Sequence, residues 1–141
     1  MFFDDIKNHV IGIDEVGRGA FCGPVVSCSI LLSEKILKED LVHQITDSKK
    51  LNEKKRILLA RFIKKNSTYH IGKATNREID KFNILQATIL SMKRSYAKFE
   101  NSENLVKIDG VETFHLNKRT NFITSGDSKS VSIAAASILA K

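Results

Sequence analysis

Four acidic side chains stand where short apolar segments of this sequence end. They are Asp14, Glu15, Asp109 and Asp127. Short β-branched segments bounded by turn residues predict strands. Strand ends are the places where α/β proteins assemble functional sites, because rigid strands deliver side chains to a common edge. A single acid after a strand is more often a turn residue than a ligand, but the fourfold recurrence indicates one shared site.

Clustered carboxylates of this kind predict a site for hard divalent cations. Neighbouring carboxylates repel each other, and the pKa of each rises unless a cation compensates the charge. Oxygen ligands suit Mg²⁺ or Mn²⁺ far better than Zn²⁺. Two such ions held about 3.5–4 Å apart stabilise both the attacking and the leaving oxygen of a phosphodiester bond. The four acids therefore predict metal-dependent phosphodiester hydrolysis, with Mg²⁺ or Mn²⁺ as the cofactor.

The first two acids are adjacent, which sets a condition on the backbone. Residues of a strand alternate between the two faces of a sheet, so Asp14 and Glu15 point apart in a straight strand. A bend at Val16 and Gly17 would let both side chains reach one site from different sides. We therefore expect the chain to bend directly after the two acids.

Glycines around Arg18 and a lysine further along the chain are the candidate substrate contacts. Gly17 and Gly19 leave backbone groups open to a sugar-phosphate chain. Such contacts can recognise the 2′-hydroxyl that distinguishes RNA from DNA. Within the basic stretch 46–56 we assign a phosphate contact to Lys49, and we expect most of the other basic residues there to solvate a helix face.

The composition is that of one globular domain with a basic surface. The chain has 141 residues, 42% of them hydrophobic and 28% charged, and a net charge of +7. Such a domain attracts polyanions, most commonly nucleic acid, although a surface solvated by lysine is the alternative. Cys22 and Cys28 lack metal-site spacing and predict small buried thiols. With no long apolar segment and no secretory signal pattern, we expect a cytoplasmic protein without a membrane span.

Hydrophobic periodicity and turn residues predict five strands and three helices. The strands are expected over residues 9–14, 25–32, 67–74, 104–109 and 121–125. The helices are expected over 52–65, 77–100 and from 128 onward, with Asn52 as the N-cap of the first. One apolar stripe of helical period is expected to face the core, formed by Leu85, Ile89, Met92, Tyr96 and Phe99. The alternation of elements predicts an α/β fold with a mixed sheet and helices packed on it.

Five segments resemble, in the same order, the motifs of the ribonuclease HII family. They are GIDEVGRGAFCGPVV (12–26), DSKKL (47–51), EIDKFNILQAT (78–88), IDG (108–110) and GDSKSVSIAAASILAK (126–141). The resemblance implies a ribonuclease H-like fold, with a mixed five-stranded sheet and flanking helices. It also implies Mg²⁺- or Mn²⁺-dependent endonucleolytic cleavage of the RNA strand of RNA–DNA hybrids, and cleavage 5′ of ribonucleotides embedded in DNA.

The resemblance also implies roles for individual residues. The family's four catalytic and metal-binding carboxylates fall on the four acids named above. The loop that contacts the ribose 2′-hydroxyl at an RNA–DNA junction falls on Gly17, Arg18 and Gly19, and a lysine near the substrate backbone falls on Lys49. The expected partners are RNA–DNA hybrids or DNA with embedded ribonucleotides, in the removal of primers and misincorporated ribonucleotides. We expect a monomer.

The chain departs from the family pattern at two places. Val111 follows Asp109 and Gly110, where the family usually has Asn. Family members also continue past the segment 134–141 with a basic helix extension, a tyrosine that stacks on the sugar at the junction, and further helices. We therefore expect residues 1–141 to form a single ribonuclease H-like domain that ends inside a helix, with the C-terminal helical part missing.

Two alternative interpretations remain at this point. The first is a catalytically weak or inactive shortened protein that only binds hybrid nucleic acid through its basic surface. The second is a metal-binding α/β domain whose acids contribute to stability alone. Cleavage of a substrate that contains a ribonucleotide distinguishes both from an active nuclease.

Overall fold

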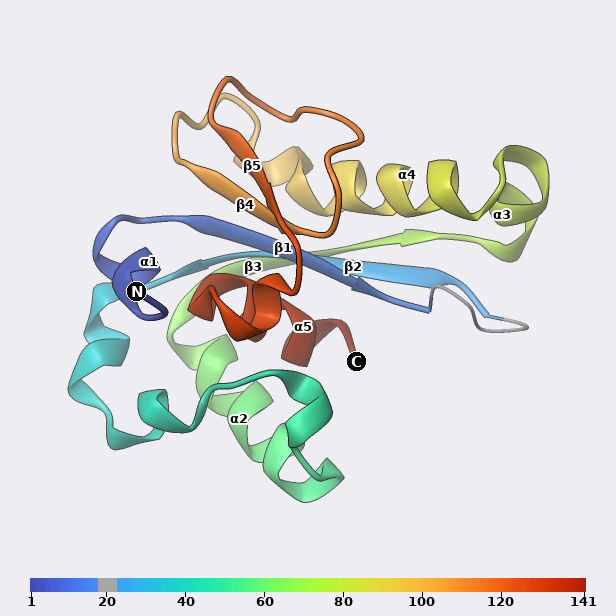
Figure 1. Ribbon diagram of the computed structural model, residues 1–141. Helices are drawn as coiled ribbons and strands as arrows, with labels where there is room; N and C mark the ends of the chain where they lie inside the picture. Colours follow the sequence, from blue (N-terminus) through green and yellow to red (C-terminus); the bar gives the residue numbers. More distant parts are fainter. Residues whose placement is uncertain (18–22) are drawn as a thin grey trace.

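A single mixed sheet of five strands organises the molecule (Figure 1). The computed structural model describes residues 1–17 and 23–141. The strands are β1 (Ile11–Val16), β2 (Val25–Leu32), β3 (Ser67–Ala74), β4 (Val106–Asp109) and β5 (Thr120–Ile123), in the spatial order β3-β2-β1-β4-β5. The first three strands pair antiparallel, whereas β4 pairs parallel with both β1 and β5. This confirms the predicted mixed sheet.

Helices cover both faces of the sheet (Figure 1). They are α1 (Asp4–Lys7), α2 (Glu53–Lys65), α3 (Asn76–Phe82), α4 (Ile84–Tyr96) and α5 (Val131–Ala140). Helices α5 and α2 share a hydrophobic cluster with one face of β2, through residues such as Cys28 and Ile30. On the opposite face, α4 contributes Met92 and Tyr96 to a second cluster with β1 and β4. The core therefore consists of two layers of side chains separated by the sheet.

Glycines in two strands allow both central helices to approach the sheet closely. A Cβ atom at Gly12 of β1 would lie 2.3 Å from the backbone carbon of Ser132 in α5. A Cβ atom at Gly72 of β3 would lie 2.2 Å from the backbone oxygen of Ser91 in α4. Atoms that are not bonded to each other do not come this close. Only glycine therefore fits at these two points of closest approach.

The strand predictions are confirmed, two of them to the residue. Residues 25–32 and 67–74 are strands over their full predicted ranges, and the other three strands differ from prediction by one to two residues at their ends. The prediction of Asn52 as an N-cap is also confirmed, because its side-chain oxygen accepts a hydrogen bond of 2.8 Å from the backbone N–H of Lys55.

The prediction of one helix over 77–100 is wrong, because Asn83 divides this segment. Asn83 adopts φ of 78°, which ends α3, and its side chain accepts a 2.9 Å hydrogen bond from the backbone N–H of Gln86, which begins α4. Asn is one of the few residues that tolerate this left-handed conformation. The chain then leaves α4 through a short 3₁₀ turn, Ala97–Phe99.

Most of the predicted apolar stripe is core, with one exception. Ile89, Met92 and Tyr96 are buried, and Phe99 packs against the same cluster. Leu85 lies in the first turn of α4 and is 38% exposed, so its assignment to the core was wrong. The last helix starts at Val131 instead of 128, because residues 126–128 form a 3₁₀ turn and Ser130 is the N-cap.

Candidate active site

Asp14 lies near the end of β1, on the face that carries α5. Gly12 contacts α5, and Asp14 shares its face because strand residues two apart point the same way. The Asp14 side chain is only 5% exposed. Its Oδ1 accepts a 2.8 Å hydrogen bond from the backbone N–H of Glu15. The first acid of the sequence pattern is therefore a buried carboxyl beneath a helix.

Glu15 points toward the opposite face of the sheet, where it lines a groove together with Asp109. This groove of about 250 Å³ lies between α4 and the segment that follows β4. Strand β1 stays paired with β2 as far as Val16, and Gly17 then adopts φ of 104°. The predicted bend thus lies at Gly17, one residue past the strand, and Val16 is not part of it.

Asp109 is held at the end of β4 by the backbone that leads into α5. Its Oδ1 accepts a 2.6 Å hydrogen bond from the backbone N–H of Gly126. Strands β1 and β4 run parallel, so their carboxyl ends deliver Asp14 and Asp109 to the same edge of the sheet. Parallel pairing is what brings together two acids that lie 95 positions apart.

Asp127 occupies the 3₁₀ turn before α5 and is 6% exposed. Its side chain is hydrogen-bonded to that of Asp47, a residue that sequence reasoning did not assign to the site. Asp47 also accepts a 3.0 Å hydrogen bond from the backbone N–H of Lys49. The only sequence signal for Asp47 is that it opens the DSKKL segment, in which attention falls on the lysines.

Burial and mutual repulsion shift the pKa values of these acids upward. Burial, and then the negative charges of Asp109 and Glu15, raise the pKa of Asp14 to about 9. Burial also raises the pKa of Asp127, as do its hydrogen bond to Asp47 and the charges of Asp47 and Asp109. The charge of Lys49 acts in the opposite direction on Asp127, which places this lysine beside the site.

The pKa of Asp47 is lowered, whereas that of its neighbour Asp127 is raised. Burial acts to raise its pKa, but the backbone N–H of Lys49 and the hydrogen bond with Asp127 outweigh burial and lower it. The charges of Lys49 and Lys50 act in the same direction.

The donor set of the site fits a hard divalent cation. Within residues 1–17 and 23–141, none of the four predicted ligands forms a salt bridge with a basic side chain, so their charge has no such partner there. All four offer carboxylate oxygens, the ligands that Mg²⁺ and Mn²⁺ prefer. Across the same residues no three acidic, histidine or cysteine side chains already converge as a metal cluster. Their role as metal ligands stays a prediction.

A family comparison decides what this arrangement belongs to. The model of the ribonuclease HII family matches residues 11–141, which include all five strands and all four acids. The chain belongs to the ribonuclease HII family. The resemblance stated from the sequence motifs is thereby confirmed.

Curated relatives named ribonuclease HII match this chain over almost its whole length. It is 45% identical to ribonuclease HII of Pelagibacter ubique (strain HTCC1062), over 92% of this chain and 68% of the relative. It is 44% identical to ribonuclease HII of Nostoc sp. (strain PCC 7120), over 99% of this chain and 63% of the relative. The chain thus spans about two thirds of the length of these relatives.

Solved structures show the same fold. An RNase HII from Archaeoglobus fulgidus, in a complex with PCNA, superposes with a TM-score of 0.73 at 25% identity and covers 94% of this chain and 70% of that one. Bst-RNase HIII in complex with Mn²⁺ superposes with a TM-score of 0.73 at 23% identity, over 93% of this chain and 50% of that one. The predicted ribonuclease H-like fold is therefore confirmed.

The remaining predicted site residues of this ribonuclease HII chain divide into two groups. Lys49 adjoins Asp47, because its backbone N–H donates a 3.0 Å hydrogen bond to that side chain, and its charge acts to lower the pKa of Asp127. Gly17 follows β1 in a left-handed conformation, whereas Arg18 and Gly19 lie outside the described residues. Their predicted contact with a ribose 2′-hydroxyl is untested by the structure.

The described cysteine has no part in this chemistry. Cys28 is buried, and burial raises the pKa of its thiol to about 12, so the thiolate form is absent at neutral pH. This agrees with the prediction of a buried free thiol, and Cys22 lies outside the described residues. No helix in the described part of the chain is long and apolar enough to cross a membrane.

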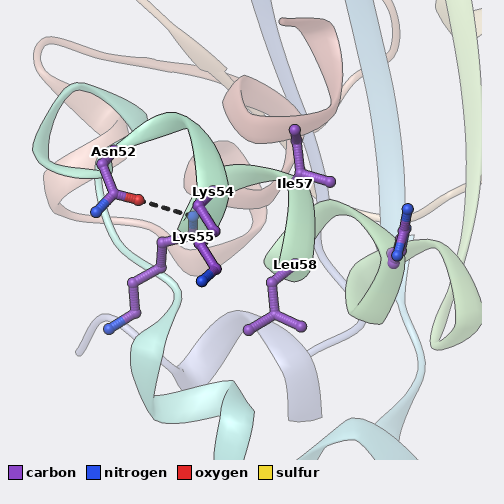
Figure 2. Close-up of a pocket in the computed structure, with 6 residues that line it drawn as sticks. Asn52, Lys54, Lys55, Ile57 and Leu58 are labelled. Carbon is purple, nitrogen blue, oxygen red and sulfur yellow. Dashed lines mark hydrogen bonds between the residues drawn. The ribbon is translucent and has the colours of Figure 1, made fainter.

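A second surface hollow lies on α2, and none of the four acids lines it. Its volume is about 470 Å³, and it is lined by Asn52, Lys54, Lys55, Ile57, Leu58 and Arg61. Figure 2 shows these side chains along the outer side of α2, together with the hydrogen bond that caps the helix at Asn52. Volume alone does not identify the candidate site, because two of the four acids, Glu15 and Asp109, line the smaller groove of about 250 Å³.

Proposed function

We propose that this chain is a Mg²⁺- or Mn²⁺-dependent endoribonuclease of the ribonuclease H type. Its substrates are the RNA strand of RNA–DNA hybrids and DNA with embedded ribonucleotides, which it cuts on the 5′ side of the ribonucleotide. The observation that carries this proposal is the buried Asp14 carboxyl, whose pKa burial and the charges of Asp109 and Glu15 raise to about 9. A carboxyl in such a place needs a cation to become charged at neutral pH.

Asp14, Glu15, Asp109 and Asp127 would hold the cations from the edge of the sheet. Two cations held there would supply an activated water and a charge that stabilises the leaving 3′ oxygen, so that the products would carry 5′-phosphate and 3′-hydroxyl ends. Asp14 and Asp109 approach from adjacent parallel strands, and the hydrogen bond from Gly126 orients Asp109. Mn²⁺ is present in the related Bst-RNase HIII structure, which supports the choice of cation class.

The remaining residues would position the nucleic acid. Lys49 is exposed beside Asp127, where its ammonium would contact a phosphate of the cleaved strand. Gly17, Arg18 and Gly19 would contact the ribose 2′-hydroxyl at the junction. We further propose that residues 1–141 act as one catalytic domain and as a monomer. The net charge of +7 supports binding to a polyanion.

Cleavage of a defined substrate tests this function. Duplex DNA with a single ribonucleotide is incubated with the chain and Mg²⁺ or Mn²⁺, and the products are resolved by length. We expect one cut on the 5′ side of the ribonucleotide, no cut with EDTA, and no cut by Asp14→Asn. The exposed Asp40 provides a control, because Asp40→Asn changes the net charge equally and should cut like the wild type.

The same assay separates the alternatives. Binding of the duplex without any cut, in either metal, would support a protein that only binds hybrid nucleic acid. A folded sample that neither binds nor cuts would contradict both functions and leave a metal-binding domain. Folding is checked beforehand by circular dichroism and by a cooperative thermal transition.

A further inference from the structure

A short loop that carries Lys49 is ordered by its own hydrogen bonds. We define the lysine loop as Asp47–Lys50, the 3₁₀ turn η3 (Ser48–Lys50) with its N-cap Asp47. The Asp47 side chain accepts from the backbone N–H of Lys49 at 3.0 Å, and the Asp47 carbonyl accepts from the N–H of Lys50 at 2.9 Å. The Ser48 carbonyl accepts from the N–H of Leu51 at 3.2 Å. These bonds set the shape of the loop and leave its placement on the protein to other contacts.

One buried side-chain hydrogen bond ties this loop to the core. The Oγ atoms of Ser48 and Ser137 are 2.6 Å apart, and the two residues are 2% and 7% exposed. Ser137 belongs to α5, every residue of which is buried, so it provides a rigid point of attachment. Ser48 is the buried member of the loop, and Lys49 and Lys50, which follow it, are exposed.

The same helix begins beside the carboxylates. Asp127 lies in the turn that leads into α5. The lysine loop packs against the same helix, and the backbone N–H of Lys49 donates to the Asp47 side chain at 3.0 Å. The acid in the turn that leads into α5 and the residue of α5 that anchors the lysine loop thus lie ten residues apart on one continuous segment. A rigid helix keeps the distance between the two constant.

We propose that Ser48 and Ser137 are positioning residues of this ribonuclease, whose hydrogen bond holds the lysine loop on α5 so that Lys49 presents its ammonium beside the carboxylate site. The inference rests on the proposed function and names residues that act through Lys49 without contacting the substrate. A flexible lysine loses conformational entropy when it binds a phosphate. An anchored backbone reduces the part of this cost that comes from the loop itself.

The chain contains a matched control for this hydrogen bond. The Oγ atoms of Ser29 and Ser95 are also 2.6 Å apart and fully buried, and they join β2 to α4 on the other face of the sheet. Ser95→Ala removes the same kind of bond as Ser137→Ala, together with a 2.8 Å hydrogen bond from the Ser95 hydroxyl to the carbonyl of Met92 in its own helix. Neither change creates a large cavity, and both are made in a helix. A difference between the two variants thus reports on position and not on the loss of a hydroxyl pair.

The first measurement is amide hydrogen exchange by NMR on the wild type and both variants. In Ser137→Ala, the amides of Lys49, Lys50 and Leu51 should exchange about fivefold faster, the size expected when a hydrogen bond of about 1 kcal/mol is lost. In Ser95→Ala they should exchange at the wild-type rate. If these three amides exchange at equal rates in all three proteins, the Ser48–Ser137 hydrogen bond does not hold the lysine loop in place.

The second measurement is steady-state cleavage of the duplex with one ribonucleotide. A phosphate contact made equally in the ground state and the transition state affects KM and leaves kcat unchanged. Ser137→Ala and Ser48→Ala should each raise KM about fivefold, with kcat within about twofold of the wild type. The double variant should match either single variant, because both remove one interaction. Ser95→Ala should leave both constants unchanged.

The outcomes separate this inference from the function on which it rests. Cleavage with the same KM in all variants overturns the positioning role and leaves the nuclease function intact. A fall in kcat in Ser137→Ala at constant KM also overturns it, since the lysine would then act only in the transition state. A wild-type chain that is folded and does not cut overturns the proposed function, and the positioning role with it.

Discussion

At the scale of single residues, the acids of this protein are defined by what surrounds them. Asp14 is almost fully buried and lies near two other acids, so its charged form is disfavoured. Asp127 is in a similar position, next to Asp47 and Asp109. An exposed acid such as Asp40 has no comparable environment. The protein therefore bears a cost in stability at the place where we propose that metal binds.

A neutral isostere at Asp14 should stabilise the metal-free protein. Asp14→Asn keeps the shape of the side chain and replaces a carboxyl that must take up a proton on folding, because its pKa is raised to about 9 in the folded state. In EDTA near pH 8, we expect the free energy of unfolding to rise by about 1–3 kcal/mol, the usual cost of an unsatisfied buried polar group. Urea denaturation followed by circular dichroism measures this change.

Added Mg²⁺ provides the complementary test of Asp14. A ligand that binds only the folded state raises its stability, so Mg²⁺ should raise the melting temperature of the wild type. It should raise that of Asp14→Asn much less. Equal shifts in both proteins would show that Asp14 does not bind the cation, while the Asp40→Asn variant should shift like the wild type.

At the scale of elements, the structure depends on how segments begin, end and touch. Helix α3 begins with a capping box between Thr75 and Glu78, and Glu78 also pairs with Arg94 of α4 through two bonds of 2.7 and 2.6 Å. Arg94 donates a further 2.7 Å hydrogen bond to the carbonyl of Lys73 in β3. This side-chain network closes the corner that Asn83 creates between the two helices.

The Glu78–Arg94 pair should make the stability of this corner depend on pH. The pKa of Glu78 falls from 4.5 to about 2. The main cause is the hydrogen bonding of its carboxylate to Arg94, and the second is the hydrogen bond that it accepts from the backbone N–H of Thr75. Because the folded-state pKa is the lower one, the pair stabilises the protein above pH 4.5, and this contribution is lost as the pH falls toward 2. Glu78→Gln should therefore be less stable than the wild type at pH 7, and the difference should shrink below pH 4.5.

Urea denaturation at pH 7, 4 and 3 measures this difference. Glu103 is exposed and forms no side-chain ion pair among the described residues, so Glu103→Gln is a control that changes the same charge. A stability difference between Glu78→Gln and the wild type that is constant from pH 7 to pH 3 would contradict the assignment.

The close contact of α5 with β1 should not tolerate a methyl group. In Gly12→Ala the new Cβ would meet the backbone of Ser132, and backbone cannot rotate away as a side chain can. We expect a loss of about 3 kcal/mol in the free energy of unfolding, at the upper end of the usual cost of overpacking. Gly72→Ala should cost a similar amount on the other face, where it meets α4. A loss below about 1 kcal/mol at Gly12 would contradict this packing.

At the scale of the whole molecule, a buried polar cluster joins the two ends of the chain. Asp5 of α1 is 1% exposed and accepts a 2.6 Å hydrogen bond from the ammonium of Lys107 in β4. Its other oxygen accepts hydrogen bonds from the hydroxyl of Ser130 and, at 3.3 Å, from the backbone N–H of Ser132. Asp5 thus fixes the start of α5, the helix on which both the acid Asp127 and the lysine loop depend.

Removal of this carboxylate should destabilise the entire domain. Asp5→Ala leaves the ammonium of Lys107 without its partner and the first turn of α5 without an acceptor. Breaking a buried pair in this way costs about 3–5 kcal/mol, and we expect about 3 kcal/mol because Lys107 retains some solvent contact. Thermal denaturation measures the loss. Asp4→Ala, in the same helix but exposed, should change stability by less than about 0.5 kcal/mol.

Local physics explains what could be predicted from the sequence alone. Strands 25–32 and 67–74, the N-cap at Asn52 and the core positions Ile89 and Met92 all follow from interactions within a few residues along the chain. The positions of Asp14, Glu15 and Asp109 near the ends of β1 and β4 were equally evident, whereas Asp127 lies in a 3₁₀ turn beyond β5. The family motifs added the identity of the fold, which strand count and alternation left open.

The tertiary structure decided which distant residues meet. Asp47 reaches Asp127, and Ser48 reaches Ser137, across 80 and 89 positions of sequence. Likewise Asn83 divides the segment 77–100, although the apolar periodicity continues through it. The side-chain cap of Asn83 and the Glu78–Arg94 pair stabilise the corner between α3 and α4. Hydrophobic periodicity shows only which face of a helix or strand a residue occupies. Pairs across the sheet depend on strand order and helix packing, which become definite only when the chain folds and its long-range contacts form together.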